Sequence, residues 1–277
     1  MTTDEKSLRT NLAHAGWRDH ILRGWSLFRH LIGSTSFWNL WSLALGGPKL
    51  SRSDELVLDA LAVSSSAADP RLPPMKVIRL LGSYGGVMAA VAGGLAYQEE
   101  ASIGTWTAGA AARDLADLAT AMAEVPDGGS GPPGEAVALV LDSWRALGRR
   151  PAGFGVPARN VDERVVGLRP CLQALGRCEA PFWRLAEEVE RCLTKRRPAP
   201  LNIAGAAAAA CLDLGFKPRQ ICVLTIAFAQ HSFVGNALEG AAAAPEILRR
   251  LPTSAVDYRG PPPRRSPRSL ASDPDAP

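Results

Sequence analysis

Few side chains in this 277-residue chain can transfer protons near neutral pH, because only four histidines are present. They are His14, His20, His30 and His231, so three of them lie in the first thirty residues. The five cysteines include no C-x-x-C pair, and the histidines lie mostly far from them along the chain. No metal site is predicted. The odd number of cysteines and their apolar neighbours indicate free thiols, and therefore a cytoplasmic protein.

Charge and hydropathy argue against two further classes of partner. The net charge of +4 is small, and the two basic clusters do not suggest a nucleic-acid-binding face. One cluster, 195–197, ends a predicted helix, where cations suit the helix dipole, and the other, 264–268, lies in a proline-rich tail. Two uncharged stretches, 80–97 and 220–238, contain glycines or polar residues and are predicted to be buried helices. The N-terminus has no apolar secretory signal. We therefore expect no nucleic acid and no membrane as partner.

The elements that must position any site are helices. Apolar residues recur every three or four positions over 21–32, 108–125, 135–147 and 182–193. Ser51 or Ser53 can cap a further helix that carries Glu55 in its first turn. No run alternates as a half-buried strand does. The predicted fold class is therefore all-α.

Glycine- and proline-rich segments interrupt these helices at three places. The segment 126–134 is predicted to be a flexible break, and 151–157 (PAGFGVP) is predicted to be a turn that can act as a hinge. From residue 251 onward proline and charge accumulate and apolar periodicity stops, so we expect 260–277 to be a disordered tail.

Several motifs, in order along the chain, resemble those of citrate synthases and, more closely, those of their short bacterial relatives, the citryl-CoA lyases. The N-terminal ones are RGWSL (23–27), LIG (31–33), SF (36–37) and LGG (45–47). The later ones are VAGGL (91–95), GFG (153–155) with DER (162–164), LNIAGAAAAACLDLGF (201–216) and YRGP (258–261). Their order and spacing over residues 18–261 carry the resemblance.

The resemblance implies an all-α, two-domain fold and a homodimer. The large domain would comprise residues 17–149 and 225–251, and the small domain residues 150–224. A flexible N-terminus, 1–16, and a proline-rich tail, 252–277, would flank them. The ligand would lie in the cleft between the domains. The Ala- and Gly-rich helices at 82–97 and 108–122 would lie near the two-fold interface, where small residues permit close approach.

Active members of that family use an aspartate to take a proton from an acyl-CoA, and two histidines to stabilise the enol and polarise a keto acid. Arginine and histidine side chains hold the carboxylates. In this chain the matching positions hold residues that cannot titrate near neutral pH: Thr107 and Val156 for the two histidines, Ala204 for the aspartate, Ala229 and Asn236 for an arginine and a histidine, and Ala68 near a further histidine. The usual catalytic residues are therefore replaced, and the usual chemistry is not expected.

The candidate site is built from what remains. The candidate catalytic residues are His231, Thr107 and Asn202. The candidates for binding CoA are Gly153, Phe154, Gly155 and Arg159, because glycines permit close approach of a ligand and arginine suits phosphate. The candidates for binding substrate are Trp106, Asn236 and Arg164.

Structural interpretations stay open for most of these residues. His231 lies two residues after Ala229, so it is either a packed or interface histidine or a relocated acid or base. Trp106 can line a pocket or fill it. The two asparagines can serve structural networks or a ligand, and Arg164 can be structural.

Two functions follow from this resemblance. The first is a divergent protein that binds an acyl-CoA or a carboxylate small molecule in the interdomain cleft and performs non-standard C–C bond or acyl-transfer chemistry. The second is a catalytically inactive binding or regulatory subunit, which forms a homodimer or pairs with an active homologue. No tightly bound cofactor is expected, and a CoA thioester would be the substrate.

Overall fold

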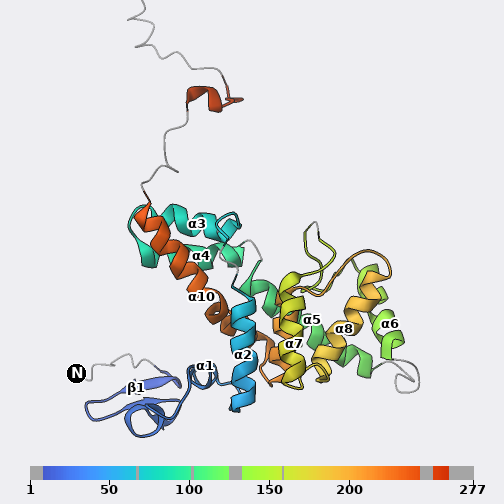
Figure 1. The fold of residues 1–277 in the computed structure, drawn as a ribbon, viewed down its shortest axis with the longest axis horizontal. Helices are drawn as coiled ribbons and strands as arrows, with labels where there is room; N and C mark the ends of the chain where they lie inside the picture. The colour runs from blue at the N-terminus through green and yellow to red at the C-terminus, as the bar shows by residue number, and fades with distance from the viewer. Residues whose placement is uncertain are drawn as a thin grey trace, which may run out of the picture.

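The computed structural model describes residues 9–66, 69–100, 103–124, 133–157, 159–243 and 252–261. Helices dominate it, so the predicted all-α class is confirmed (Figure 1). The α-helices are α1 (Phe37–Leu45), α2 (Arg52–Ser64), α3 (Pro73–Gly82), α4 (Val87–Glu100), α5 (Thr105–Ala123), α6 (Pro133–Ala146), α7 (Glu163–Ala174), α8 (Pro181–Thr194), α9 (Ile203–Asp213) and α10 (Pro218–Ala242). A 3-10 turn, η3 (Thr253–Ala255), follows them. Most of the predicted break at 126–134, and the tail beyond residue 261, lie outside the described residues.

The N-terminal segment does not form the helix predicted over 21–32. It forms three short antiparallel strands and one π-helical turn: β1 (Ala13–Ala15), β2 (His20–Leu22), β3 (Trp25–Ser26) and η1 (Leu27–Leu31). The reason is local, since Arg23 and Gly24 have φ angles of 49° and 84°, which turn the chain between β2 and β3 and interrupt any helix. Because β1 pairs with β2, residues 13–15 belong to a sheet rather than to a flexible N-terminus.

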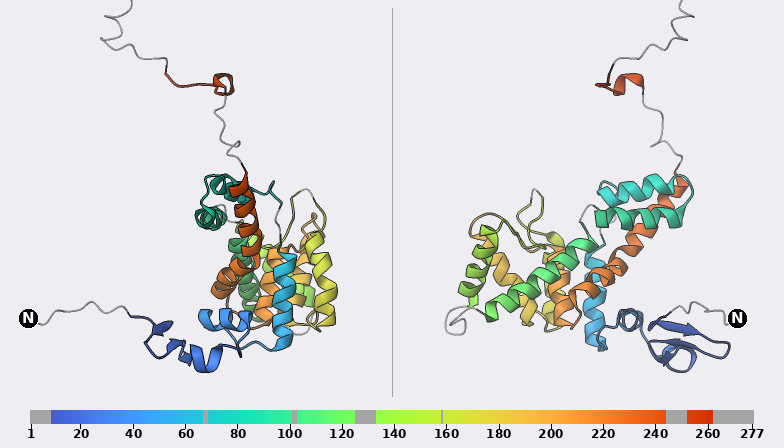
Figure 2. Two further views of the ribbon diagram at one scale, coloured as in Figure 1. Left: turned by 60° about the vertical axis from the view of Figure 1, so that its left-hand side comes forward. Right: turned by 180° about the vertical axis from the view of Figure 1, so that it is seen from behind.

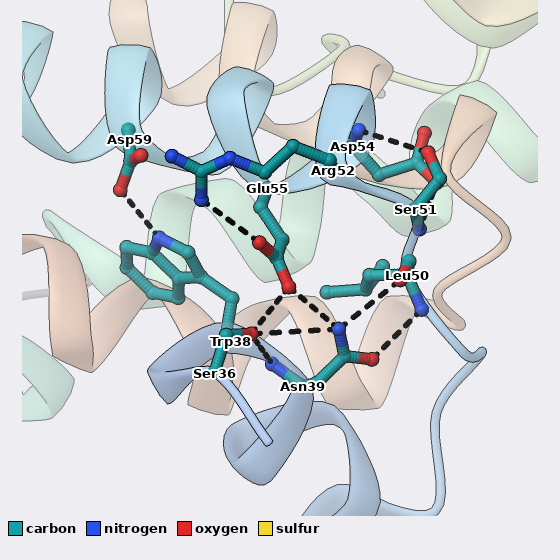
Figure 3. A network of polar contacts seen from close by, with 9 residues as sticks. All are labelled: Ser36, Trp38, Asn39, Leu50, Ser51, Arg52, Asp54, Glu55 and Asp59. Carbon is teal, nitrogen blue, oxygen red and sulfur yellow. Dashed lines mark hydrogen bonds and ion pairs between the residues drawn. The ribbon is translucent and has the colours of Figure 1, made fainter. Parts of the chain in front are cut away.

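A polar network around the buried Glu55 joins α1 to α2 (Figure 3). Its carboxylate accepts hydrogen bonds from the Ser36 hydroxyl, from Asn39 Nδ2 at 2.6 Å and from Arg52 Nη1 at 3.0 Å. The Ser36 bond is the largest of the effects that keep the pKa of Glu55 below its ordinary value, although burial opposes them. Of the two predicted caps, Ser51 is the one that begins α2.

α10 is the helix around which the others assemble. It packs against α1, α2, α3, α4, α5 and α9, and Figures 1 and 2 show it running from the α3–α4 pair into the rest of the helical body. Phe228 and Phe233 of α10 are almost fully buried. Gly82 of α3 touches the backbone of α10, since a Cβ there would lie 2.8 Å from the Ala237 carbonyl oxygen. At Gly82, therefore, the small residue of a predicted interface helix allows close packing within the chain.

Two further features of α10 bear on the sequence predictions. By length and composition alone α10 could cross a membrane. The core helix of a soluble fold meets the same criteria, and α10 packs on six helices and carries the buried polar residues Thr225, Ser232 and Asn236. The domain boundary predicted between residues 224 and 225 falls inside this helix, which is continuous from Pro218 to Ala242.

Candidate functional site

The turn at 151–157 is fastened to the start of α9. Gly153 and Gly155 have φ angles of 87° and 91°, in the region that favours glycine. The Gly155 amide donates to the Pro200 carbonyl at 2.7 Å, and the Asn202 amide donates to the Gly153 carbonyl at 3.0 Å. The predicted turn is therefore present, and backbone hydrogen bonds fix it rather than leave it loose.

Asn202 is the N-cap of α9 and completes this fastening. Its Oδ1 accepts hydrogen bonds from the amides of Ala204 and Gly205 at 3.0 and 3.1 Å, while its Nδ2 donates to the Gly155 carbonyl at 3.0 Å. Both polar ends of the side chain are thus occupied by the backbone. Of the two interpretations of Asn202, the geometry supports the structural one, and it does not support the predicted catalytic role.

Gly153 and Gly205 touch backbone to backbone. A Cβ on Gly205 would lie 2.3 Å from the Gly153 carbonyl oxygen, and one on Gly153 would lie 2.6 Å from the Gly205 Cα. Gly153 therefore serves contact with α9, and not the predicted close approach to a ligand. Around Gly155 a Cβ would meet nothing within 4 Å, so its glycine is needed for its φ angle alone.

A buried carboxylate, Asp162, connects the start of α7 to the start of α9. Asp162 accepts hydrogen bonds from Arg164 Nε and Nη2 at 2.8 and 2.7 Å, and from the Ile203 amide at 2.9 Å. The Asp162 side chain is 1% exposed. Burial acts to raise its pKa, but the bonds from Arg164 and Ile203 outweigh it and hold the pKa below the ordinary value. Arg164 is thereby fixed at the edge of α9.

The start of α9 borders a cavity of about 220 Å³, which we call the apolar cavity. Its lining includes Ala204 and Ala229, the positions that resemble those of the family's aspartate and arginine. Arg164 is the one charged side chain among the described residues that line it. Much of the remaining wall is apolar, from α3, α5, α9, α10 and the residue before Gly104: Met75, Ile103, Ala108, Ile203, Phe228 and Phe233.

Two buried polar side chains in the wall of the apolar cavity lack partners. Gln98 of α4 is 6% exposed and Ser232 of α10 is 4% exposed. Gln98 Oε1 and Ser232 Oγ have no hydrogen-bond partner in the described part of the chain. An unpaired buried polar atom typically costs about 1–3 kcal/mol. These two atoms are therefore hydrogen-bonding groups that the fold itself leaves unsatisfied.

A second and larger cavity, of about 540 Å³, lies on the other side of the turn, between α6 and α8. We call it the arginine cavity, because five arginines line it against one carboxylate, that of Asp142. The five are Arg145, Arg149, Arg150, Arg196 and Arg197. Phe154 of the turn also lines it, so the predicted role of Phe154 in binding remains open.

The arginines of this cavity differ in their ion pairs. Arg149 bonds to Asp114 and Asp117 at 2.6 and 2.7 Å and lies over the Trp144 ring. Arg196 bonds to both oxygens of Asp142, at 2.6 and 3.0 Å. Arg150 and Arg197 have no acidic partner within the ranges that the structure describes. The cavity therefore presents uncompensated positive charge, which suits a phosphate-bearing ligand.

Two predicted site residues on α10 do not line the apolar cavity. His231 is exposed, its Nε2 lies 2.7 Å from the Ser66 hydroxyl, and it does not line the cavity. Asn236 is 4% exposed, donates to the Ser232 carbonyl at 3.0 Å and accepts from Arg79 at 3.3 Å. Asn236 thus joins α10 to α3, which supports its structural interpretation.

The first turn of α5 faces the apolar cavity with other residues than those predicted. Gly104, Thr105 and Ala108 line the cavity, whereas Trp106 and Thr107 do not. Residues 105 and 108 share a helix face, and the two residues between them are turned by about 100° per residue. Trp106 is 38% exposed and does not line the apolar cavity, so it does not fill it.

Arg159, predicted to bind CoA, is paired at the surface. It donates to Glu163, and their side chains are 58% and 61% exposed. It lines neither cavity. The position near Ala68, predicted to lack a family histidine, lies outside the described residues.

Sequence reasoning missed the two sets of residues that define the cavities. The cluster at 195–197 carried a signal, but it was interpreted as cations that complement a helix end. Its convergence with 145–150 depends on how α6 packs against α8. Gln98 and Ser232 gave no signal, because an isolated amide or hydroxyl on an apolar helix is common.

The described residues hold no group of three His, Cys, Asp or Glu side chains that could bind a metal ion. All five cysteines are free, and burial raises the pKa of the Cys211 thiol to about 12. This thiol is therefore unreactive near neutral pH.

No protein-family model matches the sequence, and no curated protein matches it. Solved structures do resemble the fold. Citryl-CoA lyase from Hydrogenobacter thermophilus superposes with a TM-score of 0.75 at 21% identity, over 95% of this chain and 99% of that one. Citrate synthase from Thermotoga maritima gives a TM-score of 0.57 at 18% identity, over 82% and 58%.

A longer enzyme contains the same fold. ATP citrate lyase from Methanothrix soehngenii, solved with citrate and coenzyme A, gives a TM-score of 0.68 at 17% identity. The match covers 92% of this chain and 42% of that one. The resemblance predicted from the motifs is thereby confirmed at the level of fold, and this chain has the fold of the citrate synthase superfamily.

Proposed function

We propose that this protein binds a CoA thioester, with the phosphates in the arginine cavity and the acyl group in the apolar cavity. The observation that carries the proposal is that the two cavities border two segments, the turn at 151–157 and the start of α9, that are hydrogen-bonded to each other. Phe154 lines the arginine cavity, while Ile203 and Ala204, directly after the Asn202 cap, line the apolar cavity. Asn202 joins these two segments through its bond to Gly155.

The electrostatics of the arginine cavity support a ligand with several phosphates. One guanidinium group can donate two parallel hydrogen bonds to a phosphate. Arg150 and Arg197 are free to do so, because no acidic side chain among the described residues forms an ion pair with them. CoA carries a diphosphate and a further phosphate on its ribose. The solved ATP citrate lyase, which has the same fold, contains coenzyme A.

The chemistry of the apolar cavity favours binding over catalysis of the family's usual reaction. Removing a proton from an acyl group needs a base near the acyl carbon. Arg164 is the one ionisable side chain among the described lining residues, and it is held by Asp162. We therefore favour a binding or regulatory role, as the second sequence hypothesis expects.

A non-standard acyl transfer is the second candidate. It is supported by Arg164 itself, because Asp162 occupies Nε and Nη2 while Nη1 makes no hydrogen bond to any other residue that the structure describes. A guanidinium N–H beside a thioester would stabilise an oxyanion as it forms. In this case an external nucleophile, such as water or an alcohol, would attack the thioester carbonyl carbon, the C–S bond would break, and CoA would leave as the thiol with the proton from the nucleophile.

Thermal denaturation tests the proposal. CoA, dephospho-CoA and citrate should be compared at low and high salt, because a ligand that binds the native state raises Tm. We expect CoA to raise Tm most, dephospho-CoA less, and salt to reduce both shifts. The absence of any shift with CoA contradicts the proposal. A thiol-release assay with citryl-CoA and acetyl-CoA separates the candidates, since release supports acyl transfer and its absence supports binding alone.

We further propose that the protein is cytoplasmic and acts as a homodimer or as a heteromer with an active homologue. Exposed apolar side chains support an assembly, because Tyr84, in the turn between α3 and α4, and Met88 of α4 are 70% and 83% exposed. Light scattering of the purified chain, and co-expression with an active homologue, test the two assemblies. A monomer that also fails to co-purify with the homologue contradicts both.

A further inference from the structure

We propose that Asp142 substitutes for a phosphate group in the arginine cavity: its carboxylate occupies Arg196 in the free protein, and a phosphate of the ligand displaces it. Arg196 then becomes a further phosphate-binding residue, beside Arg150 and Arg197. This inference rests on the proposed function, because it concerns how the same cavity binds its ligand and what limits its affinity. Its basis is the ion pair that Arg196 forms in the wall of the cavity.

The Asp142 carboxylate binds Arg196 in the way that a phosphate would. Arg196 Nη1 donates to Oδ1 at 2.6 Å and Nη2 donates to Oδ2 at 3.0 Å, which is the paired arrangement that arginine also forms with two phosphate oxygens. The bond from Arg196 keeps the pKa of Asp142 below its ordinary value, so the carboxylate is charged at neutral pH. Arg145 Nη2 lies 3.9 Å from the same carboxylate. This one acid therefore compensates part of the positive charge of the cavity.

The pair is placed so that a ligand can replace it. The side chains of Arg196 and Asp142 are 51% and 45% exposed, so water can solvate the carboxylate once it is displaced. An ion pair of this exposure contributes little to stability. The pair beside the apolar cavity differs, because Asp162, which holds Arg164, is 1% exposed and a buried carboxylate needs its partner. Of these two arginines, Arg196 is the one that can be released to a ligand.

Asp142 should therefore weaken phosphate binding in two ways. A phosphate that takes Arg196 must first break the existing pair, and the displaced carboxylate then lies near a ligand of the same charge. Arg150 and Arg197 form no ion pair with an acidic side chain that the structure describes, so they bind phosphate without this competition. Removing the carboxylate should make binding tighter. A purely structural role of the pair predicts unchanged or weaker binding instead.

Isothermal titration with CoA at low salt tests the inference on the unchanged protein, Asp142→Asn, Arg196→Ala and the double variant. We expect Asp142→Asn to bind about tenfold more tightly than the unchanged protein, because both the competition and the repulsion are removed. In the Arg196→Ala background the same substitution should gain about threefold or less, since only the repulsion remains. Equal affinities of the unchanged protein and Asp142→Asn, or equal gains in the two backgrounds, overturn the inference.

Glu239→Gln is the matched control. Glu239 of α10 also accepts two hydrogen bonds from one arginine of another helix, Arg79 of α3, at 2.7 and 3.1 Å. Neither residue lines the arginine cavity or the apolar cavity. Because Glu239→Gln makes the same change in net charge, it should alter the affinity for CoA by about twofold at most. A gain as large as that of Asp142→Asn would make net charge alone responsible and would overturn the inference.

Pyrophosphate, titrated into the same proteins, separates this inference from the proposed function. If CoA binds to none of them while pyrophosphate follows the expected pattern, the proposed function is contradicted and this inference is supported. If CoA binds equally well with and without the Asp142 carboxylate, the proposed function stands and this inference is overturned. Failure of both ligands to bind contradicts both.

Discussion

Asn202 caps α9 with its carboxamide oxygen and holds the Gly155 carbonyl with its nitrogen, at 3.0 Å. One side chain thus sets the position of the turn that borders the arginine cavity relative to the helix that borders the apolar cavity. The sequence motif suggested a catalytic candidate at this position. In the structure, Asn202 instead fixes the turn at 151–157 against the first residues of α9.

Replacing Asn202 should therefore weaken both stability and binding. Asn202→Ala removes a helix cap and one hydrogen bond, and we expect the free energy of unfolding to fall by about 1–2 kcal/mol. Chemical denaturation measures this loss. Asn202→Ser is the control, since a serine hydroxyl keeps a helix cap but does not replace the donor to Gly155, so its loss should be smaller. A stable Asn202→Ala variant with unchanged CoA binding would contradict the positioning role.

The contact between Gly153 and Gly205 predicts a steric requirement. In Gly205→Ala the new Cβ would lie 2.3 Å from the Gly153 carbonyl oxygen, so the turn must move away from α9. We expect a loss of about 1–3 kcal/mol in unfolding free energy. Gly235→Ala on α10 is the matched control, because a Cβ there meets nothing within 4 Å. It should be neutral or slightly stabilising in the same denaturation experiment, and similar losses in both variants would refute the requirement.

Asp162 should make stability depend on acid pH. Its folded pKa lies below the ordinary value of 3.8, so its contribution is complete above that value and is lost as pH falls through the lower folded pKa. Thermal melts between about pH 2 and pH 7 should show this loss below about pH 4. In Asp162→Asn we expect a lower Tm at neutral pH and a flatter acid limb, because Arg164 then lacks its carboxylate. An acid limb equally steep in both proteins would exclude Asp162 as a source of the pH dependence.

His231 should be dispensable for the proposed binding. It is exposed, contacts the Ser66 hydroxyl, and does not line either cavity. We expect His231→Ala to change unfolding free energy by no more than about 0.5–1.5 kcal/mol, the range of a single hydrogen bond. Titration of this variant with CoA should give the affinity of the unchanged protein. A tenfold loss would restore His231 as a site residue.

The helices were predictable because their signals are local. Apolar periodicity and the Ser51 cap place α2, α5, α6 and α8 to within a few residues of the observed bounds. The N-terminal strands were missed for the same reason, since the periodicity at 21–32 resembles a helix. The φ angles that Arg23 and Gly24 adopt override it, and periodicity carries no information about them.

The site was predictable only where it lies within one motif. The GFG turn and the replaced positions at Ala204 and Ala229 could be identified from the order of the motifs, and both alanines line the apolar cavity. The arginine cavity joins two segments some fifty residues apart, such as Arg145 and Arg196 around Asp142. Gln98 and Ser232 come together through the packing of α4 and α10. Spacing along the sequence does not encode such contacts.

The central claim is tested most directly by equilibrium binding of CoA to the unchanged protein, to a variant with Arg150→Ala and Arg197→Ala, and to Arg159→Ala. The account predicts that CoA binds, that the double variant weakens binding by about tenfold or more, and that Arg159→Ala has no effect. Arg159 is the matched control, because it is a surface arginine outside both cavities. No binding of CoA, or equal affinity in the double variant and the unchanged protein, would contradict the account.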